Sequence, residues 1–396
     1  MRTQDFEGSP TGLLVPISGL DRRYGEWGHV AFVAHQLPEE TPQLDVPTFN
    51  AVSAARAALA SLNSSARQLP NPSLLRRPTL RREAQSTSAL EGTYAPLQAV
   101  LAADEDDDPA DANLREVLNY VHAAEHAFSW HGAGRPLATI LLTELHAVLV
   151  RGTAADNEQA GRIRTIQVVI GGHPGGRVQD ARFVPHPPGP ELERKVRDWL
   201  SWVDESHRGH IDPVVAAGMA HHHFETLHPF NDGNGRIGRL LIVLHFLYAQ
   251  VLTEPTLTVS PWFEARQADY YDALMGVSAH GDWNRWIRFF ADGIAASARD
   301  TEDRLLDLLQ VQADLKMRIR KAGLRADNAM LLVDFALAQP IFTVRQVERR
   351  LGVTYPRANK LVGQLVGIGV LRQFDEAVYD RSFAAPDVVG ILLRSG

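Results

Sequence analysis

The sequence predicts a mainly α-helical protein with a β-hairpin near the middle of the chain and a winged helix-turn-helix module at its C-terminal end. Three observations lead to this prediction. Apolar residues recur at helical spacing over most of the chain. Between Arg162 and Pro188, β-branched residues alternate with other residues on one side of a tip rich in Gly and Pro. From about Ala326 the pattern changes to short helices followed by two short strands.

The composition is that of an ordinary globular protein. The 396 residues suffice for two or three domains, and 45% of them are apolar and 22% charged. A net charge of -7 argues against a broadly basic surface, and the absence of cysteine excludes disulfides and thiolate nucleophiles. The first ten residues do not resemble a signal peptide, and the apolar stretch Leu240 to Leu252 is shorter than the roughly 18 residues that span a membrane. We therefore expect a cytoplasmic protein without a membrane partner.

Helical spacing begins at Thr48, after a stretch without clear periodicity. A turn at Leu69 to Ser73 closes the first helix, and the acidic run Asp104 to Asp108 is expected to be a solvated loop. The predicted helices cover residues 48–69, 75–101, 113–128, 137–149, 191–203, 213–225, 234–249, 262–277 and 283–315.

The segment from His228 to Arg239, HPFNDGNGRIGR, carries the most chemical information. Pro229 disfavours helical geometry in the residue before it, so His228 is expected on a loop. There a neutral imidazole can accept a proton from a hydroxyl nucleophile. Asp232 offers the hard oxygen ligand that Mg²⁺ prefers when it bridges phosphates. The first half of the segment therefore suits proton transfer beside a metal-bound phosphate.

The second half of the segment predicts a phosphate site. Gly233 and Gly235 let the backbone approach an anion closely, at the start of a helix whose free N–H groups point outward. Arg236 and Arg239 are three residues apart, so they share one helix face and can both reach a polyphosphate. A base, a metal ligand, a phosphate cradle and two guanidinium groups together indicate phosphoryl or nucleotidyl transfer.

Two other interpretations of this region have weaker support. Gly233, Gly235 and Gly238 match the glycine pattern of dinucleotide-binding domains, but that pattern requires a preceding buried strand, and here the preceding residues have a helical pattern. The consecutive histidines His221 to His223 could suggest a metal site. Consecutive residues of a helix point in different directions, however, so at most one or two could converge on a metal.

At these residues the chain resembles the Fic (Fic/Doc) family, whose motif H-P-F-x-[D/E]-G-N-G-R-x-x-R is matched at every defined position. The wider resemblance covers roughly Thr48 to Ala296. It implies a helical Fic core and a protein adenylyltransferase that uses ATP and Mg²⁺ to transfer AMP to a Tyr, Ser or Thr hydroxyl of a target protein. The acidic residue at position 232 favours adenylylation over the other chemistries of the family.

The resemblance also implies a role for each matching residue. His228 would be the general base and Asp232 the Mg²⁺ ligand, while Phe230 would anchor the loop in the core. Tyr270 and Tyr271 match a pair that lies near the adenine in related proteins. The phosphate site would comprise Gly233, Asn234 and Gly235 as an anion hole, with Arg236 and Arg239 on the β and γ phosphates.

A second stretch, Thr87 to Gly92 (TSALEG), resembles the inhibitory motif [S/T]-x-x-x-E-[G/N] of the family. A Glu91 carboxylate paired with Arg239 would occupy the guanidinium that the γ-phosphate needs. The alternative is an exposed glutamate at a helix end, followed by Gly92 as a C-cap. In the reverse reaction, removal of AMP, Glu91 would instead align a water, and the sequence does not separate the two directions.

The predicted hairpin from Arg164 to Pro185 resembles the flap of the family. Its open edge could bind the target segment by strand addition and thereby bring a hydroxyl near His228. An ordinary structural hairpin is the alternative.

The C-terminal residues fit a winged helix. We expect helices over Asp327–Ala338, Val344–Leu351 and Pro356–Ile368, with Thr343 as an N-cap, and wing strands at 370–374 and 378–383. In the predicted recognition helix, Arg357, Asn359 and Lys360 lie where base and phosphate contacts belong, which would suit a transcription regulator whose Fic region senses nucleotide. Acidic residues are about as frequent as basic ones, so a protein partner is the alternative; the wing acids are Asp375, Glu376 and Asp380.

The sequence therefore predicts four parts and leaves a homodimer open. They are an N-terminal Fic-associated region with the inhibitory helix (1–110), a Fic catalytic core (111–300), a helical linker (301–325) and a winged helix-turn-helix domain (326–396).

Overall fold

The computed structural model describes the chain except for residue 22 and residues 69–71, 105–108, 173–175, 207–208, 325–326, 375–380 and 395–396. The chain forms two compact units, and the four-part division stays a prediction. The first unit comprises Met1–Leu59, Asn119–Thr253 and Trp262–Ala296, and the second comprises Ala60–Leu118, Glu254–Pro261 and Ser297–Gly396. Four helices contribute residues to both units: α1 (Val46–Arg67), α4 (Ala112–Gly132), α9 (Ser260–Glu264) and α11 (Trp283–Lys321).

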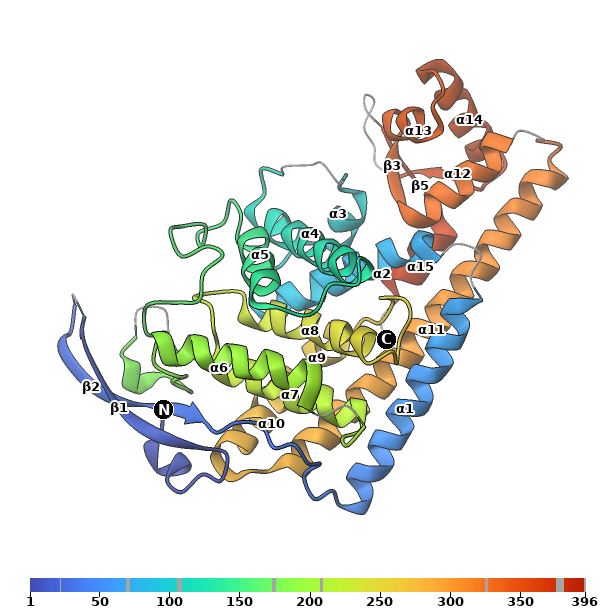
Figure 1. Ribbon diagram of the computed structural model, residues 1–396. Helices are drawn as coiled ribbons and strands as arrows, with labels where there is room; N and C mark the ends of the chain where they lie inside the picture. The colour runs from blue at the N-terminus through green and yellow to red at the C-terminus, as the bar shows by residue number, and fades with distance from the viewer. Residues whose placement is uncertain are drawn as a thin grey trace. The chain divides into compact units, whose positions relative to one another are not determined.

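The first unit begins with a short 3-10 helix, η1 (Thr3–Phe6), and a β-hairpin that the sequence analysis did not predict (Figure 1). Strand β1 (Gly12–Asp21) pairs antiparallel with β2 (Gly25–Ala34) along its full length. The rings of Phe6 and Phe32 lie 5.6 Å apart, and both pack against Phe183. This small aromatic cluster gives the hairpin a hydrophobic core of its own.

Two helices form the centre of the first unit. Helix α7 (Pro213–Leu227) and helix α8 (Asn234–Tyr248) pack against each other and are buried on almost every face. A helix that is buried all round is typical of the core of a larger unit. The other elements here are α5 (Thr139–Leu149), η2 (Val178–Asp180), α6 (Pro190–Ser201), η3 (Trp202–Ser206) and α10 (Gln267–His280), and α9 (Ser260–Glu264) lies at the boundary of the two units.

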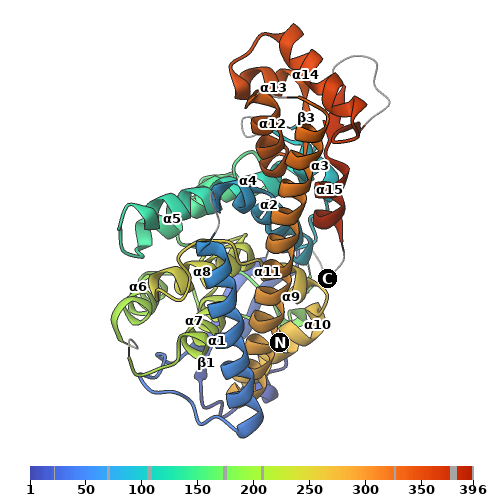
Figure 2. The same cartoon turned by 90° about the vertical axis from the view of Figure 1, so that its right-hand side faces the viewer.

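The second unit contains α2 (Pro72–Leu90), α3 (Leu97–Ala102) and a C-terminal module, defined here as residues 327–394. Figure 2 shows the module from a second direction. Its short strands form an antiparallel sheet in the order β3-β5-β4, and its apolar residues share one hydrophobic core with α3 and α11. The elements of the module are α12 (Asp327–Ala338), β3 (Ile341–Thr343), α13 (Val344–Leu351), α14 (Tyr355–Gly367), β4 (Arg372–Gln373), β5 (Ser382–Ala384) and α15 (Pro386–Leu393).

Most helix predictions are confirmed to within a few residues, but two are wrong in continuity. The helix expected over residues 75–101 is interrupted, because the chain turns at Gly92, whose φ is 88°, before α3 begins. The helix expected over residues 262–277 is split into α9 and α10. Among the described residues, no helix combines the length and the apolar character that crossing a membrane requires.

The predicted flap hairpin is present in part: its two arms meet at an antiparallel bridge, and the N–H of Arg182 donates to the carbonyl of Gly171. The bridge joins Ile170 and Phe183, with N···O distances of 2.9 and 3.0 Å. Beyond it, the backbone N–H of Phe32 in β2 donates to the carbonyl of Val184 at 2.9 Å. The outgoing arm is therefore tied to the N-terminal hairpin rather than forming a long ladder with the incoming arm. Part of the predicted tip, residues 173–175, lies outside the described residues.

The C-terminal module has the predicted helices at almost the predicted bounds. Thr343 caps α13, and its hydroxyl accepts a hydrogen bond from the backbone N–H of Gln346 at 3.4 Å. Strand β3 and helix α15 are additional elements that the sequence analysis did not predict. The acidic wing residues and most of the acidic run after Asp104 lie outside the described residues, and the winged-helix assignment stays a prediction.

Candidate active site

His228 follows the last residue of α7 and has left-handed backbone angles, φ 50° and ψ 61°. Its N–H donates to the carbonyl of Phe224 at 2.9 Å, which ends the helix. The ring atom Nδ1 lies 3.3 Å from the carbonyl of Glu225. Because a carbonyl can only accept, this contact favours a proton on Nδ1 and leaves Nε2 as the basic nitrogen.

Arg164 is the residue that holds this backbone in place, and the sequence analysis did not single it out. Its side chain is 1% exposed. Its Nε donates to the carbonyl of His228 at 2.7 Å, and its NH2 donates to the carbonyls of His186 and Leu227. Burial lowers the pKa of Arg164 to about 10, so the guanidinium remains charged at neutral pH. The only local signal was a charged residue in the otherwise strand-like stretch 164–170.

Asn234 closes the loop that carries the motif. Its side-chain oxygen accepts from the N–H of Phe230 at 2.9 Å, and its side-chain nitrogen donates to the carbonyl of the same residue at 2.8 Å. Phe230 is fully buried and stacks on the ring of His146 with the centroids 4.3 Å apart. The amide of Asn234 therefore shapes the loop, which leaves backbone N–H groups as the donors of the predicted anion hole.

His146 is a second supporting residue that the sequence analysis missed. Its Nδ1 lies 2.9 Å from the backbone N–H of Gly161, which can only donate, so Nδ1 acts as the acceptor. Burial lowers the pKa of His146 to about 4, and the ring is therefore neutral in the physiological range. A neutral ring can stack on Phe230 without placing another positive charge beside Arg236.

The glycines of the motif meet specific steric demands. Gly233 precedes α8 with φ 75°, and a Cβ there would lie 2.6 Å from the side chain of Leu149. Gly238 faces α7, and a Cβ there would lie 2.3 Å from Oε1 of Glu225. Gly238 therefore allows α7 and α8 to pack closely. This packing explains the third glycine of the motif without a role in binding a dinucleotide.

The start of α8 is rich in buried positive charge. Arg236 is 2% exposed and Arg239 is 1% exposed. Arg236 donates from NH2 to Oδ2 of Asp232 at 3.3 Å, and the side chain of Asp232 is 49% exposed. Two buried guanidinium groups at the positive end of a helix dipole favour a polyanion.

Asp232 fits a Mg²⁺ ion that is held jointly with phosphates. Its exposed carboxylate can turn from Arg236 to a cation, and Mg²⁺ is commonly bound through one or two carboxylates plus substrate phosphates. Within the described part of the chain, no cluster of three His, Cys, Asp or Glu side chains could hold a metal by itself. The donor set therefore suits a nucleotide-bound Mg²⁺ and not a closed protein cage.

The two tyrosines of the predicted adenine pair differ in their exposure. Tyr270 is 1% exposed, and its hydroxyl lies 2.7 Å from Nε2 of His221. Tyr271 is partly exposed, so a contact with adenine stays a prediction that now depends mainly on Tyr271. His222 bonds Ser278 and His223 lies elsewhere in the core, so the three histidines diverge, as expected from consecutive helical positions.

The predicted inhibitory residues belong to the second unit. Thr87 is buried within α2, whereas Glu91 is exposed immediately after the last residue of the helix. Gly92 takes a left-handed conformation, and its N–H donates to the carbonyl of Ala89 at 3.0 Å. The helix-end geometry is thus confirmed, and the pairing of Glu91 with Arg239 of the first unit stays a prediction.

Comparison with known proteins agrees with this site. A model described as Fic/DOC family N-terminal matches residues 49–129, and a model described as Fic/DOC family matches residues 136–246. The chain therefore contains Fic N-terminal and Fic domains, and the second match covers the whole segment from His228 to Arg239.

Curated relatives with this similarity are named protein adenylyltransferases, a class of nucleotidyltransferase. "Protein adenylyltransferase fic-1" of Caenorhabditis elegans is 35% identical over 143 residues, which are 36% of this chain and 25% of the relative. "Protein adenylyltransferase Fic" of Aedes aegypti is 32% identical over 141 residues, which are 35% of this chain and 24% of the relative. The matched region thus spans about a quarter of the length of these relatives.

Solved structures show the same fold. A Fic family protein from Desulfovibrio desulfuricans G20 superposes with a TM-score of 0.53 at 19% identity, over 87% of this chain and 98% of that one. A variant of Fic-1 from C. elegans superposes with a TM-score of 0.50 at 23% identity, over 64% of this chain and 73% of that one. The helical core around α7 and α8 is therefore a Fic fold.

Proposed function

We propose that the protein transfers AMP from ATP to a Tyr, Ser or Thr hydroxyl of a target protein. The observation that carries this proposal is the position of His228 directly before the loop that leads to the N-terminus of α8. One end of this loop provides a base whose Nδ1 lies against the backbone carbonyl of Glu225. The other end provides buried arginines that can bind phosphates. The names of the curated relatives support the same chemistry.

The reaction follows from these positions. The Nε2 atom of His228 accepts the hydroxyl proton as the hydroxyl oxygen attacks the α-phosphorus of ATP. A new O–P bond forms to the target, and the bond from the α-phosphorus to the bridging oxygen breaks, so pyrophosphate leaves. Backbone N–H groups at Gly233 to Gly235 would stabilise the negative charge that develops on the α-phosphate.

Arg236 and Arg239 would bind the leaving phosphates. Their guanidinium groups lie on one face of α8 and are already desolvated, so an ionic contact with phosphate is strong there. Asp232 would hold Mg²⁺ together with the phosphates, and the ion would neutralise charge on the leaving group. Asp232 must then exchange its contact with Arg236 for the metal.

Inhibition by Glu91 forms part of the proposal. The glutamate is exposed immediately after the last residue of α2. Pairing with Arg239 would remove the guanidinium that orients the γ-phosphate. The same carboxylate could align a water for removal of AMP, which is the second direction that the motif allows.

The proposal is tested with ATP labelled in the α-phosphate, Mg²⁺ and a cell lysate. We expect Glu91→Gly to label protein more strongly than the wild type does. His228→Ala should lower the rate by about 10²–10⁴-fold while ATP binding stays nearly unchanged. Labelling that is equal in wild type, Glu91→Gly and His228→Ala would refute the proposal. Loss of AMP from pre-modified protein, abolished by changing Glu91, would instead favour the reverse direction.

A second candidate function is DNA binding by the C-terminal module. The exposed basic side chains of α13 and α14 favour it, because the only acidic residue on these two helices is Glu348. Phosphate contacts from such residues make affinity fall steeply with salt. Arg357→Ala or Lys360→Ala should weaken binding to a duplex at physiological salt. The absence of any duplex preference over nonspecific binding would leave the module as a protein-binding element. The exposed basic residues are Arg345, Arg349, Arg350, Arg357 and Lys360.

A further inference from the structure

Helix α2 is buried although its sequence is polar. From Pro78 to Leu90 every side chain except the half-buried Gln85 is buried. Three consecutive charged residues, Arg81, Arg82 and Glu83, lie in this stretch. Buried charges are costly unless they are paired, so their partners identify what holds the helix in place.

The first tie runs from α2 through the end of α3 to the C-terminal module. Arg81 donates to the carbonyls of Leu101 and Ala103 at 2.8 and 2.7 Å. Gln339, between α12 and β3, donates from Nε2 to the same two carbonyls at 3.0 and 3.1 Å. The backbone from Leu101 to Ala103 is thus held at the same time by a side chain of α2 and by a side chain of the module.

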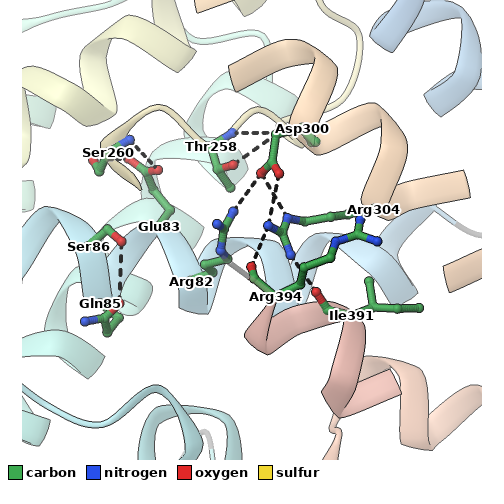
Figure 3. Close-up of polar contacts among 11 residues, drawn as sticks. Arg82, Glu83, Gln85, Ser86, Thr258, Ser260, Asp300, Arg304, Ile391 and Arg394 are labelled. Carbon is green, nitrogen blue, oxygen red and sulfur yellow. Dashed lines mark hydrogen bonds and ion pairs between the residues drawn. The ribbon is translucent and has the colours of Figure 1, made fainter. Parts of the chain in front are cut away.

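The second tie runs through Asp300 of α11 (Figure 3). Arg82 donates to Oδ2 of Asp300 at 2.9 Å, and Arg304 donates to both of its carboxylate oxygens at 2.9 and 3.0 Å. Arg304 also donates to the carbonyls of Ile391 and Arg394, at 2.5 and 2.7 Å, at the end of α15. The Asp300 carboxylate, together with Arg304, therefore connects α2 to α15, the last helix of the module.

The cluster of Arg82, Asp300 and Arg304, called the junction below, is sensitive to displacement of its members because of its charges. Burial opposes the ionisation of Asp300, but the hydrogen bond from Arg304 and the charge of Arg82 hold the pKa of Asp300 below its usual range. The carboxylate is therefore ionised at neutral pH. Removing one partner from a buried ion pair leaves an uncompensated charge, so the junction is stable as a whole or disrupted as a whole.

We propose that the C-terminal module is the input domain of α2. Because α12 packs directly on α2 and both ties end in the module, a ligand that shifts the module displaces α2. Glu91 follows the last residue of α2, so the displacement withdraws the inhibitory carboxylate. This inference rests on the inhibition proposed above and assigns to residues 327–394 the control of that inhibition.

The test removes one hydrogen-bonding side chain from each tie in the full-length chain and measures the hydrogen exchange of α2. Asp300→Asn and Gln339→Leu should each raise the hydrogen-exchange rate of α2 amides by about tenfold or more. Both variants should also raise protein labelling toward the level of Glu91→Gly. The matched control is Glu302→Gln, because Glu302 lies on the same helix α11 and its carboxylate accepts from serines of α1 and not from α2. This control should leave both measurements at the wild-type value.

The outcomes separate the inference from the proposed function. Wild-type exchange of α2 in folded Asp300→Asn and Gln339→Leu would overturn the input role. Faster exchange without a rise in labelling, when Glu91→Gly is active, would overturn the link to inhibition. A Glu91→Gly protein without activity would refute the proposed function, and the exchange data would still test the tie. If Asp300→Asn does not fold, Arg82→Lys keeps the charge but loses the planar donor and serves in its place.

Discussion

Arg164 provides the sharpest test of how the proposed catalytic loop, residues 228–233, is built. Its guanidinium donates to the carbonyls of His228, Leu227, Ile166 and His186, and its own N–H donates to the carbonyl of Pro229. The substitution Arg164→Met keeps much of the side-chain volume and removes all the side-chain donors. The carbonyls of the catalytic loop then lose their charged partner.

The magnitude follows from the number of acceptors left without a partner. Leaving one buried acceptor unsatisfied costs about 1–3 kcal/mol, and the close contacts to His228 and His186 are the two that matter most. We therefore expect Arg164→Met to lower the free energy of unfolding by about 2–6 kcal/mol. In the wild type, the left-handed backbone of His228 stores roughly 1–3 kcal/mol of strain. His228 will therefore move to a relaxed conformation once Arg164 no longer holds it.

Catalysis should fall more than nucleotide binding. The arginines that would bind phosphate lie on α8 and keep their positions, so the Kd for ATP should change by no more than a few-fold. A misplaced base should reduce kcat by about 10²-fold, as expected for loss of orientation at a reacting atom. Urea unfolding, calorimetric ATP titration and the labelling rate measure the three quantities. Arg162→Met, two residues earlier at an exposed position, is the matched control.

The reasoning would be refuted by a folded Arg164→Met protein that labels its target at the wild-type rate. Arg164→Lys gives a graded check, because one ammonium group can reach at most some of the carbonyls that the guanidinium reaches. Its kcat should lie between those of Arg164→Met and the wild type, with the same Kd for ATP.

Two further predictions test helix packing and inhibition. Gly238→Ala places a methyl group against Glu225 and should lower Tm, with a cost of about 1–3 kcal/mol, whereas Gly363→Ala on α14 meets no atom within 4 Å and should be neutral or stabilising. For inhibition, Arg239→Ala should abolish the gain in labelling produced by Glu91→Gly, so the double variant should resemble Arg239→Ala alone. Additive effects in this double-mutant cycle would show that the two residues do not act as a pair.

Helix positions could be predicted from the sequence because helical periodicity is a local property. The bounds of α13 match the prediction residue for residue, since a capping threonine and a following glycine mark both ends. The prediction of one helix over residues 75–101 missed the break between α2 and α3, although Gly92 and Pro96 lie between them and the sequence had also allowed Gly92 as a C-cap. The N-terminal hairpin was missed because Pro16 and several glycines obscure the alternation, and its strands are paired by contacts that depend on the partner strand.

The positions of the motif residues on a loop and a helix start could be predicted from the sequence, but the side-chain contacts that hold this loop could not. The motif residues converge at one loop and one helix start, as expected from their spacing. The side chain of Asn234, however, bonds the backbone of Phe230 and so acts within the loop. Nothing local in the sequence announces that Arg164 is buried among carbonyls from three separate segments, because that environment exists only after the chain has folded.

The supporting contacts also limit how regulation can act. Arg164, Asn234 and His146 hold the catalytic loop through contacts that all lie within the first compact unit. Glu91 belongs to the second unit, so moving it leaves these contacts intact. A loop that is fixed before the substrate arrives needs little reorganisation during the reaction. If Glu91 inhibits as proposed, its removal should therefore change the orientation of ATP and the rate of transfer.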